Sequence, residues 1–548
     1  MEIRRREFLS AAAGVTWVAS RALRAQTSDS RIDILLNEPG ATIAPEIYGH
    51  FVEQAGAVVY DGIWVGENAS VPNIGGIRRD VVEALKKIRP AVIRWPCGCF
   101  ADQYDWRDGI GPREKRPRRT SFWLESPEWP RNAPTTGPQR YEPNAFGTVE
   151  FVRFCRLVGA QPYFGSNLRS LPSQEFWRWV EYCNSPAGTT TLADQRAADG
   201  EREPLNVRYW GVGNESWGCG GNFQPEEYAS EFRRYSAWVP SYGVRPALIG
   251  AGPADNDREW TRRFFAKAGS AGLDHLWGWA VHHYSWNASG GRSDSWTEAK
   301  GDALQFNAEQ YYEILRAAGE MDGILTSQWG VMAESDPRHR VKIVVDEWGA
   351  WHKPGTEPFP EALLGQQNTM RDAVLAGLTL DTFNRHADKV AMANVAQLVN
   401  FLQSPLLAHQ NQICLTPTYH VFGLYADHQG GQSVRTVFSS ADVSYTRNGA
   451  NATIRGLDGS ASVRGNQLTL TVTNPWFDRE VEAEIAIRGG NMKSVSAYTL
   501  AASDPHAHNS FEQPENVAPK PSAIALKSGV VVHRSPAASV TKISFVMG

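Results

Sequence analysis

The stretch YWGVGNESWGCGG, residues 209–221, begins as an apolar run and then passes at once into Asn214, Glu215 and a cluster of glycines. The apolar half has the length of a buried strand. A carboxylate directly after a buried strand is unusual in a structural core, but it is typical of α/β barrels, where polar residues at the carboxyl ends of strands carry the chemistry. The stretch therefore predicts a barrel strand that delivers Glu215 to a cleft.

Similar runs recur along the chain and alternate with amphipathic segments. Strand-like runs occupy residues 91–95, 161–164, 207–212, 247–250, 279–282 and 342–345. Helix-like segments occupy residues 78–87, 148–158, 225–238 and 308–318. This alternation predicts a (β/α)8 TIM barrel over residues 45–420, and no G-x-G-x-x-G follows the first strand to favour a dinucleotide fold.

The pattern changes after residue 430. Residues 467–472, 481–487 and 540–546 alternate between apolar and polar side chains, with Asn-Pro and Gly-Gly turns between them. Alternation with period two predicts an antiparallel β-sandwich, jelly-roll-like, over residues 421–548. The strand-like opening near residue 32 is expected to join it, so residues 31–44 are assigned to the same domain.

The composition narrows the function classes. The 548 residues are 42% hydrophobic and 21% charged, with a net charge of −4. These values are typical of a globular protein and exclude the basic surface that nucleic acid or an anionic membrane would require. The 20 Trp and 17 Tyr are compatible with sugar binding, since flat rings stack on the apolar faces of sugars.

The N-terminus has the features of an export signal. Arg5 and Arg6 precede Phe8-Leu9 and a short apolar run at residues 11–19, which is too short to span a bilayer. The arginine pair resembles a twin-arginine signal. Residues 1–25 are therefore expected to be a cleaved signal, and the protein is expected to be exported to the periplasm or the extracellular space.

The six cysteines form no C-x-x-C pair and no ligand-like spacing with histidine. A zinc site is therefore not predicted, and no cofactor motif is present. Free thiols in the core are the favoured interpretation, and the pairing of any disulfide is left open.

Two glutamates follow barrel strands, Glu215 and Glu347, and His282 and Tyr284 follow a third. A pair of carboxylates in an aromatic cleft is the minimum equipment for glycoside hydrolysis, in which one is protonated and the other ionised. Asp346 is the rival to Glu347, but alternation along a strand would point it to the opposite side.

Several motifs together resemble one family. They are residues 47–53 (IYGHFVE), 60–66 (YDGIWVG), 100–112 (FADQYDWRDGIGP), 209–221, 346–351 (DEWGAW) and 416–419 (TPTY). The chain resembles the α-L-arabinofuranosidases of glycoside hydrolase family 51 over nearly its whole length. The resemblance implies a retaining mechanism with the two glutamates after strands four and seven.

The resemblance also implies roles for individual residues. Glu215 corresponds to the general acid/base, Asn214 to a ligand of the sugar 2-hydroxyl, and Glu347 to the nucleophile. His282 and Tyr284 correspond to residues that orient the nucleophile. The remaining positions expected in the arabinose subsite are Glu53, Cys99, Trp351 and Gln397.

Three departures from the family pattern bear on substrate preference. Cys97 stands where the family usually has glycine, Gln54 stands where histidine is common, and residues 167–171 replace a small glycine-bearing loop. A long loop at residues 112–143 follows a barrel strand and is placed to wall the cleft; its basic run, 113–119, is expected to be solvated.

The sequence thus predicts an exo-acting α-L-arabinofuranosidase for arabinan, arabinoxylan or related oligosaccharides. The alternatives are an endo-β-glucanase or β-xylosidase of the same family, or a non-catalytic glycan-binding relative. A pocket would favour exo action and a through-groove endo action. The resemblance further implies a homo-oligomer, possibly a hexamer, with no nucleic acid or membrane as a partner.

Overall fold

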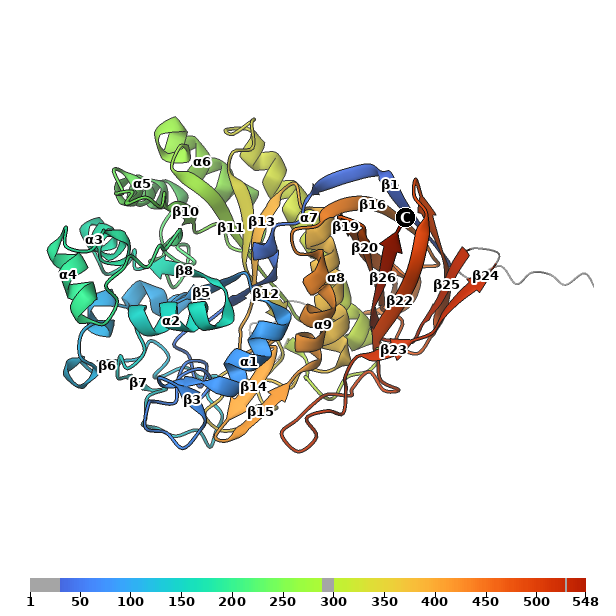
Figure 1. The fold of residues 1–548 in the computed structure, drawn as a ribbon, viewed down its shortest axis with the longest axis horizontal. Helices are drawn as coiled ribbons and strands as arrows, with labels where there is room; N and C mark the ends of the chain where they lie inside the picture. Colours follow the sequence, from blue (N-terminus) through green and yellow to red (C-terminus); the bar gives the residue numbers. More distant parts are fainter. Residues whose placement is uncertain (1–29, 288–299, 528–529) are drawn as a thin grey trace, which may run out of the picture.

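A closed barrel and a β-rich domain make up the computed structural model, which describes residues 30–287, 300–527 and 530–548. The barrel and its helices lie on the left of Figure 1 and the β-rich domain on the right, with α7, α8 and α9 between them. The predicted signal at residues 1–25 lies outside the described residues.

The barrel closes from eight parallel strands that follow one another in chain order. They are β2 (Gly49–Phe51), β5 (Val92–Trp95), β8 (Gln161–Ser166), β9 (Tyr209–Val212), β10 (Ala247–Gly250), β11 (Leu276–Ser285), β12 (Lys342–Ala350) and β13 (Val390–Val395). The predicted TIM-barrel fold is confirmed. Strand β9 begins later than predicted because Val207 exchanges both backbone hydrogen bonds with the Asn184 side chain, at 2.8 Å each, instead of joining the ladder.

Helices cover the outside of the barrel. They are α1 (Arg79–Ile88), α2 (Thr148–Val158), α3 (Ser173–Asn184), α4 (Thr191–Ala198), α5 (Pro225–Ser236), α6 (Arg258–Leu273), α7 (Ala308–Ala333), α8 (Met370–Arg385) and α9 (Pro417–Tyr425). The prediction ended α7 at residue 318, before Gly319, and was too short. The helix continues through Gly319 and Gly323 because Met321, Ile324 and Leu325 bury its inner face. Within the described residues, no helix is long and apolar enough to cross a membrane.

Ten strands pair in one continuous order to form the β-rich domain. In that order they are β23 (Lys520–Ser522), β22 (Met492–Leu500), β26 (Ser539–Met547), β20 (Gln467–Asn474), β19 (Asp458–Arg464), β16 (Gln432–Ser439), β1 (Ser30–Thr42), β21 (Val481–Arg488), β25 (Val530–Ser535) and β24 (Ile524–Lys527). Strand β1 joins the domain as expected, antiparallel to β16, but it runs parallel to β21. That parallel pair was not part of the predicted antiparallel sandwich.

Four two-stranded ladders complete the described strands. They pair β3 (Asn73–Ile74) with β4 (Ile77–Arg78), β6 (Arg119–Thr120) with β7 (Tyr141–Glu142), β14 (Leu406–His409) with β15 (Gln412–Leu415), and β17 (Val443–Arg447) with β18 (Ala450–Ile454). The second of these ladders closes the long loop that follows β5.

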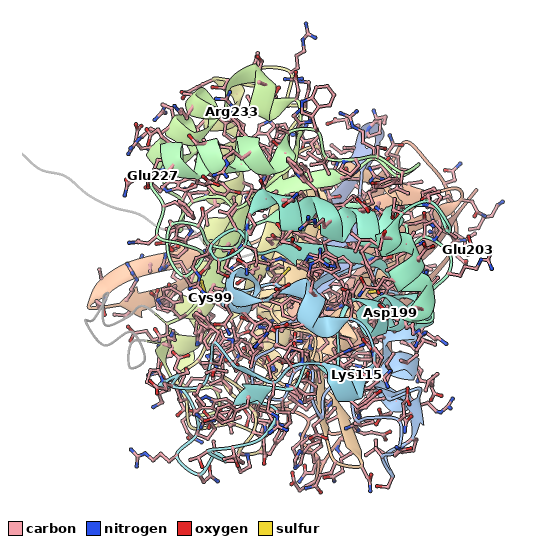
Figure 2. All side chains as sticks on the ribbon, turned by 90° about the vertical axis from the view of Figure 1, so that its left-hand side faces the viewer. Cys99, Lys115, Asp199, Glu203, Glu227 and Arg233 are labelled. Atoms are coloured by element: carbon pink, nitrogen blue, oxygen red, sulfur yellow. A yellow bond between two sulfur atoms is a disulfide. The ribbon has the colours of Figure 1, made fainter. Side chains whose placement is uncertain are left out.

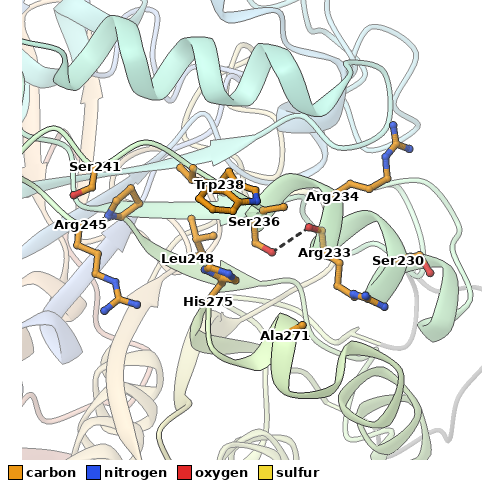
Figure 3. Close-up of a pocket in the computed structure, with 13 residues that line it drawn as sticks. Ser230, Arg233, Arg234, Ser236, Trp238, Ser241, Arg245, Leu248, Ala271 and His275 are labelled. Atoms are coloured by element: carbon orange, nitrogen blue, oxygen red, sulfur yellow. Dashed lines mark hydrogen bonds between the residues drawn. The ribbon is translucent and has the colours of Figure 1, made fainter.

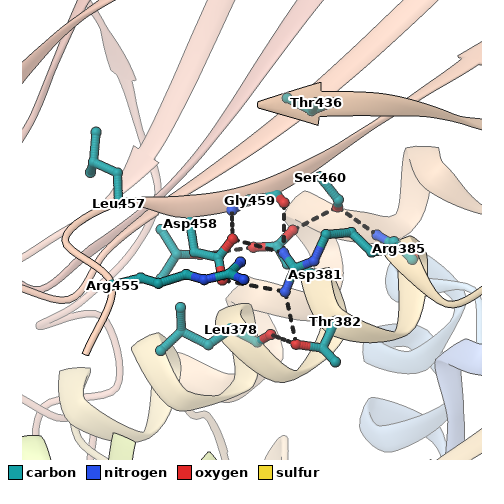
Figure 4. A network of polar contacts seen from close by, with 12 residues as sticks. Leu378, Asp381, Thr382, Arg385, Thr436, Arg455, Leu457, Asp458, Gly459 and Ser460 are labelled. Carbon is teal, nitrogen blue, oxygen red and sulfur yellow. Dashed lines mark hydrogen bonds and ion pairs between the residues drawn. The ribbon is translucent and has the colours of Figure 1, made fainter. Parts of the chain in front are cut away.

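A buried carboxylate joins the two domains. Asp381 of α8 accepts hydrogen bonds from Ser460 (2.7 Å) and Thr471 (2.6 Å) of the β-rich domain, and from Tyr425 of α9 at 2.7 Å. One turn later Arg385 pairs with Asp458 at 2.8 Å (Figure 4). Burial raises the pKa of Asp381 to about 6. A buried acidic group with these partners ties the barrel tightly to the β-rich domain.

Candidate active site

One pocket at the carboxyl ends of the barrel strands brings together the residues predicted for the catalytic and sugar-binding site. Its volume is about 610 Å³. The nine predicted site residues that line it are Glu53, Cys99, Asn214, Glu215, His282, Tyr284, Glu347, Trp351 and Gln397. They come from six different barrel strands or the loops that follow them, which is the usual origin of a TIM-barrel active site.

A larger cavity, of about 1000 Å³, lies between α5, α6 and the loop before β10 (Figure 3). Arg233, Arg245 and the exposed Trp238 line it, and Leu248 places it at the opposite ends of the barrel strands. Among the described residues, no carboxylate lines this cavity. The smaller pocket is therefore the candidate catalytic site.

The turn after β9 sets the position of Glu215. Glu215 has a φ of 38°, in the left-handed region. The buried carboxylate of Asp102 accepts the Asn214 N–H at 2.9 Å, and a Cβ on Gly220 would lie 1.7 Å from the Asn214 carbonyl oxygen. A non-glycine residue keeps such a backbone only where its surroundings hold it. Here the hydrogen bond to Asp102 and the close approach of Gly220 to the Asn214 carbonyl supply that support.

The end of β12 sets the position of Glu347. The register with β11 shifts at this point. Val281 pairs with Val345, but the next residue of β11, His282, pairs with Glu347, so Asp346 is skipped in the pairing. Glu347 then accepts Arg94 Nη1–H at 2.9 Å and the Tyr284 hydroxyl at 2.6 Å. Both of its oxygens are thus held by donors.

Asp346 lies apart from this pocket. Its carboxylate accepts the Tyr163 hydroxyl at 2.8 Å and the Asn394 amide at 3.0 Å, and it pairs with Arg94 Nε at 3.2 Å. Tyr163 belongs to the apolar cluster inside the barrel. Asp346 therefore anchors Arg94 from the barrel interior.

His282 stands between the two glutamates. Its Nδ1 lies 3.0 Å from Glu215 Oε1 and 3.6 Å from Glu347 Oε2. One oxygen of each glutamate and a ring nitrogen of His282 all lie within 4.8 Å of one another. That separation matches the approximately 5–5.5 Å of retaining glycosidases and is too short for the water of an inverting enzyme.

The charges around the carboxyl groups differ. Burial alone would raise the pKa of Glu347, but the charges of His282 and Arg94 outweigh it and hold that pKa below its usual range. The pKa of His282 is raised, because the attraction of Glu347 and Glu215 exceeds the effect of burial. Glu347 is therefore ionised, and its charge favours the imidazolium form of His282.

Glu53 occupies a third kind of environment. It accepts hydrogen bonds from the Phe100 N–H (3.0 Å), Trp123 Nε1 (3.1 Å) and Gln397 Nε2 (3.2 Å). Burial nevertheless raises its pKa to about 8. Gly98, at φ 71°, is required beside it, since a Cβ there would lie 2.3 Å from the Glu53 carboxyl group.

The long loop after β5 forms one wall of the pocket. Phe122, Trp123 and Glu128 from this loop line the pocket, together with Trp217 and Trp286 from other loops. The loop's basic run is largely paired rather than free. Its ion pairs are Arg113 with Glu67 and Glu150, Arg116 with Glu150, and Arg119 with Asp108.

Two groups of side chains have the spacing of metal ligands: Glu215, His282 and Glu347, and Cys99, Glu215 and Cys219. In the first, the Arg94 guanidinium already neutralises Glu347 at 2.9 Å. In the second, the two sulfurs are joined in a disulfide, Cys99–Cys219, and offer no thiolate. Neither set fits a resident metal ion.

The disulfide corrects the expectation of free thiols. Sequence reasoning missed it because Cys99 and Cys219 lie 120 residues apart and meet only through the fold. The other four cysteines are free and buried, as expected. Cys97, one of the departures from the family pattern, packs against Gly165, outside the pocket.

The other departures also lie away from the sugar. Gln54 accepts a hydrogen bond from Trp95 Nε1 at 2.5 Å in the buried interior. The loop at residues 167–171 is held by Asp102 and Tyr235, and none of its residues is among those that line the pocket. The loop therefore does not line the pocket, and its effect on substrate preference stays a prediction.

Three residues of the site were missed as contributors. Arg94 touches Glu347 and, through Nη2, Asn214 Oδ1 at 2.7 Å; its place at a strand end was the available signal. Asp102 supports the Glu215 turn, and Trp123 reaches Glu53 from the long loop. No periodicity in the sequence marks these last two contacts.

Comparisons with known proteins agree with this geometry. Residues 84–300 match the family model of the alpha-L-arabinofuranosidase 1 domain, and residues 346–539 match that of the alpha-L-arabinofuranosidase C-terminal domain. The chain is 36% identical to the intracellular exo-α-L-arabinofuranosidase of Bacteroides ovatus, over 96% of this chain and 97% of that protein. It is 33% identical to the structure of a GH51 arabinofuranosidase from Xanthomonas axonopodis pv. citri, with a TM-score of 0.85 over 94% of this chain and all of that one.

A further relative bears on location. The chain is 30% identical to the intracellular exo-α-(1→5)-L-arabinofuranosidase of Acetivibrio thermocellus, over 68% of this chain and 70% of that protein. Two relatives named as intracellular contradict the predicted export to the periplasm or beyond. The prediction relied on an arginine pair before a short apolar run, and so short a pattern also occurs by chance at the start of proteins that are not exported.

Proposed function

Since the chain belongs to glycoside hydrolase family 51, the α-L-arabinofuranosidases, we propose that it is a retaining exo-α-L-arabinofuranosidase. It removes terminal non-reducing α-L-arabinofuranosyl residues from arabinan, arabinoxylan or related oligosaccharides. The observation that carries the proposal is the pair of carboxyl groups within 4.8 Å of each other in one pocket, in unequal electrostatic surroundings.

Glu347 is the nucleophile. Its side chain is 7% exposed, its pKa is lowered, and Arg94 and Tyr284 hold its two oxygens. An ionised, oriented carboxylate attacks the anomeric carbon while the glycosidic C–O bond breaks, which gives a covalent glycosyl ester.

Glu215 is the general acid/base. Its side chain is 21% exposed, three times the value for Glu347, so the leaving group and water can reach it. It donates its proton to the departing oxygen in the first step. In the second step it takes a proton from the attacking water, and the C–O bond of the ester breaks to release arabinose and restore both carboxyl groups.

The other pocket residues bind the sugar. Asn214, oriented by Arg94 at 2.7 Å, is placed to meet the 2-hydroxyl. Glu53 and Gln397, bonded to each other at 3.2 Å, present polar atoms for the distal hydroxyls, and Cys99 and Trp351 complete the walls. Buried polar groups that pair with hydroxyls reject sugars that lack them, which supports selectivity for arabinofuranose.

Exo action follows from the shape of the pocket. Trp123 of the long loop lines the pocket and donates a hydrogen bond to Glu53, so the loop walls the pocket beside Glu53. A walled pocket of about 610 Å³ accepts a chain end rather than the middle of a polysaccharide.

The location and assembly are also part of the proposal. The names of the two relatives support action inside the cell. The family resemblance supports a homo-oligomer, possibly a hexamer, which light scattering on the purified chain would measure.

Hydrolysis of a panel of aryl glycosides tests the function. The panel sets α-L-arabinofuranoside beside β-D-xyloside and β-D-glucoside, with the Glu347→Ala protein as the blank, followed by arabino-oligosaccharides. Cleavage of the arabinofuranoside by the wild type and not by the blank is expected. Cleavage of the xyloside or glucoside alone would contradict the proposal.

A further inference from the structure

The disulfide Cys99–Cys219 joins two loops that wall the active-site pocket. Cys99 begins the short helical segment Cys99–Gln103 after β5, and Cys219 lies four residues after Glu215. Figure 2 labels Cys99 near the centre of its view, below the helix α5 that carries Glu227 and Arg233. Both bridged cysteines are partly exposed, whereas the four free cysteines are buried. A solute can therefore reach the disulfide but not the four free thiols.

The bridge is in direct contact with the catalytic turn. Cys219 Sγ lies 3.8 Å from Glu215 Oε2 and 4.0 Å from Asn214 Nδ2. The N–H groups of Gly218 and Gly220 both donate to the Glu215 carbonyl, at 2.8 and 3.1 Å. The residues between Glu215 and Cys219 therefore form one tight turn, and its far end is fixed to the β5 loop by the sulfur–sulfur bond.

The turn gains a further anchor at that fixed end. Glu215 has a left-handed backbone, which is strained for a residue with a side chain. Asp102 holds the start of the turn through Asn214, and the disulfide holds its end. Without the bridge, the backbone of Glu215 can relax, and its carboxyl group moves relative to Glu347.

A disulfide is not the resting state of exposed cysteines inside most cells. Bridges in reducing compartments are generally transient, and those that persist are often catalytic or redox-sensing. We propose that Cys99–Cys219 is a reversible redox modification site that holds the acid/base Glu215 in place when oxidised and releases it when reduced. This inference rests on the proposed acid/base role of Glu215 and on the proposed location inside the cell.

The reaction is thiol–disulfide exchange with a dithiol reductant. A thiolate of the reductant attacks Cys99 Sγ, the sulfur–sulfur bond breaks, and the Cys219 thiolate leaves and takes up a proton. The second thiolate of the reductant then attacks its own sulfur in the mixed disulfide and releases Cys99. The reductant ends as a disulfide, and the enzyme gains two electrons and two protons.

Cys219 acts as a positioning residue, because it acts on the reaction through Glu215. Loss of its bond should hurt the steps that need a proton from Glu215. Substrates with poor leaving groups, such as arabino-oligosaccharides, need that proton, whereas an activated dinitrophenyl arabinofuranoside leaves without it. A defect that depends on the leaving group therefore separates displaced acid/base chemistry from general damage to the fold.

The test compares oxidised and dithiothreitol-reduced full-length enzyme after removal of the reductant. Thiol titration of the unfolded protein should count four thiols before reduction and six after it. The kcat/KM on an arabino-oligosaccharide, which reports formation of the glycosyl ester, should fall about tenfold on reduction and recover on reoxidation, with a change of less than about twofold in kcat/KM on the dinitrophenyl substrate. Cys219→Ser should show the reduced value and ignore dithiothreitol, and Cys155→Ser, which removes a buried thiol on α2, should keep the wild-type response.

Three results would overturn the proposal. Equal kcat/KM values on the oligosaccharide for the oxidised and reduced forms would remove the link to Glu215. Equal losses of kcat/KM on both substrates would assign the bridge to fold support alone. A bridge that stays intact in excess dithiothreitol would not be a reversible site, and this last measurement needs no activity. A protein that cleaves no arabinofuranoside in either redox state, yet exchanges its bridge with dithiothreitol, would fail the proposed function and the positioning role while leaving the redox site in place.

Discussion

The ends of β9 and β12 carry the same side chain in opposite settings. Glu347 is nearly buried, with a guanidinium and a phenol on its two oxygens. Glu215 is more exposed, with the His282 ring at 3.0 Å and a disulfide sulfur at 3.8 Å. The contrast teaches that the fold makes two like carboxyl groups unequal mainly through the guanidinium, which is placed against Glu347 alone, whereas the His282 ring lies close to both.

Removal of the better-held carboxylate should have the largest effect. Glu347→Ala should lower kcat by about 10⁴-fold or more on every substrate, because no other group forms the covalent ester. Addition of azide should restore cleavage of an activated aryl glycoside and give a glycosyl azide of inverted configuration. The exposed Glu114→Ala serves as the matched control and should behave as the wild type. An azide product of retained configuration would exchange the two assignments.

Glu215→Ala should lower activity more selectively than Glu347→Ala, with an effect that depends on the substrate. Cleavage of oligosaccharides should fall by about 10²–10⁴-fold, the usual contribution of general acid/base catalysis. An activated aryl arabinofuranoside should still form the ester, and azide should then give the product of retained configuration. Steady-state measurements of kcat/KM on the two substrates compare the losses, and an equal loss of kcat/KM on both would argue against an acid/base role.

Arg94→Met should make the electrostatic surroundings of Glu347 more like those of Glu215. Without the guanidinium, the pKa of Glu347 should rise, because the adjacent opposite charge that stabilises its ionised form is lost. Because Glu347 reacts when ionised, the acidic limb of the pH profile should move to higher pH, and activity on that limb should fall more than activity at the pH optimum. The exposed Arg233→Met, in the other cavity, is the control. An unmoved acidic limb would contradict the assignment of the charge effect.

The third buried carboxyl group, Glu53, can be tested through the pH dependence of the free energy of unfolding. Its folded pKa of about 8 lies above its ordinary value of 4.5, so its contribution is fully present below about pH 4.5 and is lost as pH rises to about 8. The free energy of unfolding of the wild type, relative to Glu53→Gln, should therefore fall by about a few kcal/mol between pH 5 and pH 8. Denaturant titrations at both pH values measure this. A difference that does not vary with pH would mean that Glu53 is already ionised at pH 5.

Local patterns were enough for much of this molecule. Apolar runs marked six of the eight barrel strands and missed β2 and β13, and the resemblance supplied the nine residues that line the pocket. Strand ends converge by the geometry of the barrel, so their residues meet whatever the loops do.

The contacts that were missed depend on long-range packing. Arg94 reaches Asp346, Glu347 and Asn214 across the barrel, and the Cys99–Cys219 bridge needs two loops to meet. The length of α7 was also missed, because glycine weakens a helix locally while burial of Met321 and its neighbours stabilises it. These outcomes depend on tertiary partners that no window of sequence contains.

The pairing of β1 with β16 imposes an order on synthesis. Strand β1 is the first described element to leave the ribosome, yet Thr42 pairs with Gln432, about 390 residues later. At about 5–20 residues per second, its edge waits roughly 20–80 s without its partner. The barrel can form during that interval, but the β-rich domain must wait for the end of the chain. A nascent chain stalled before β16 would expose an unpaired strand, and such an edge is a template for aggregation that chaperones would have to cover.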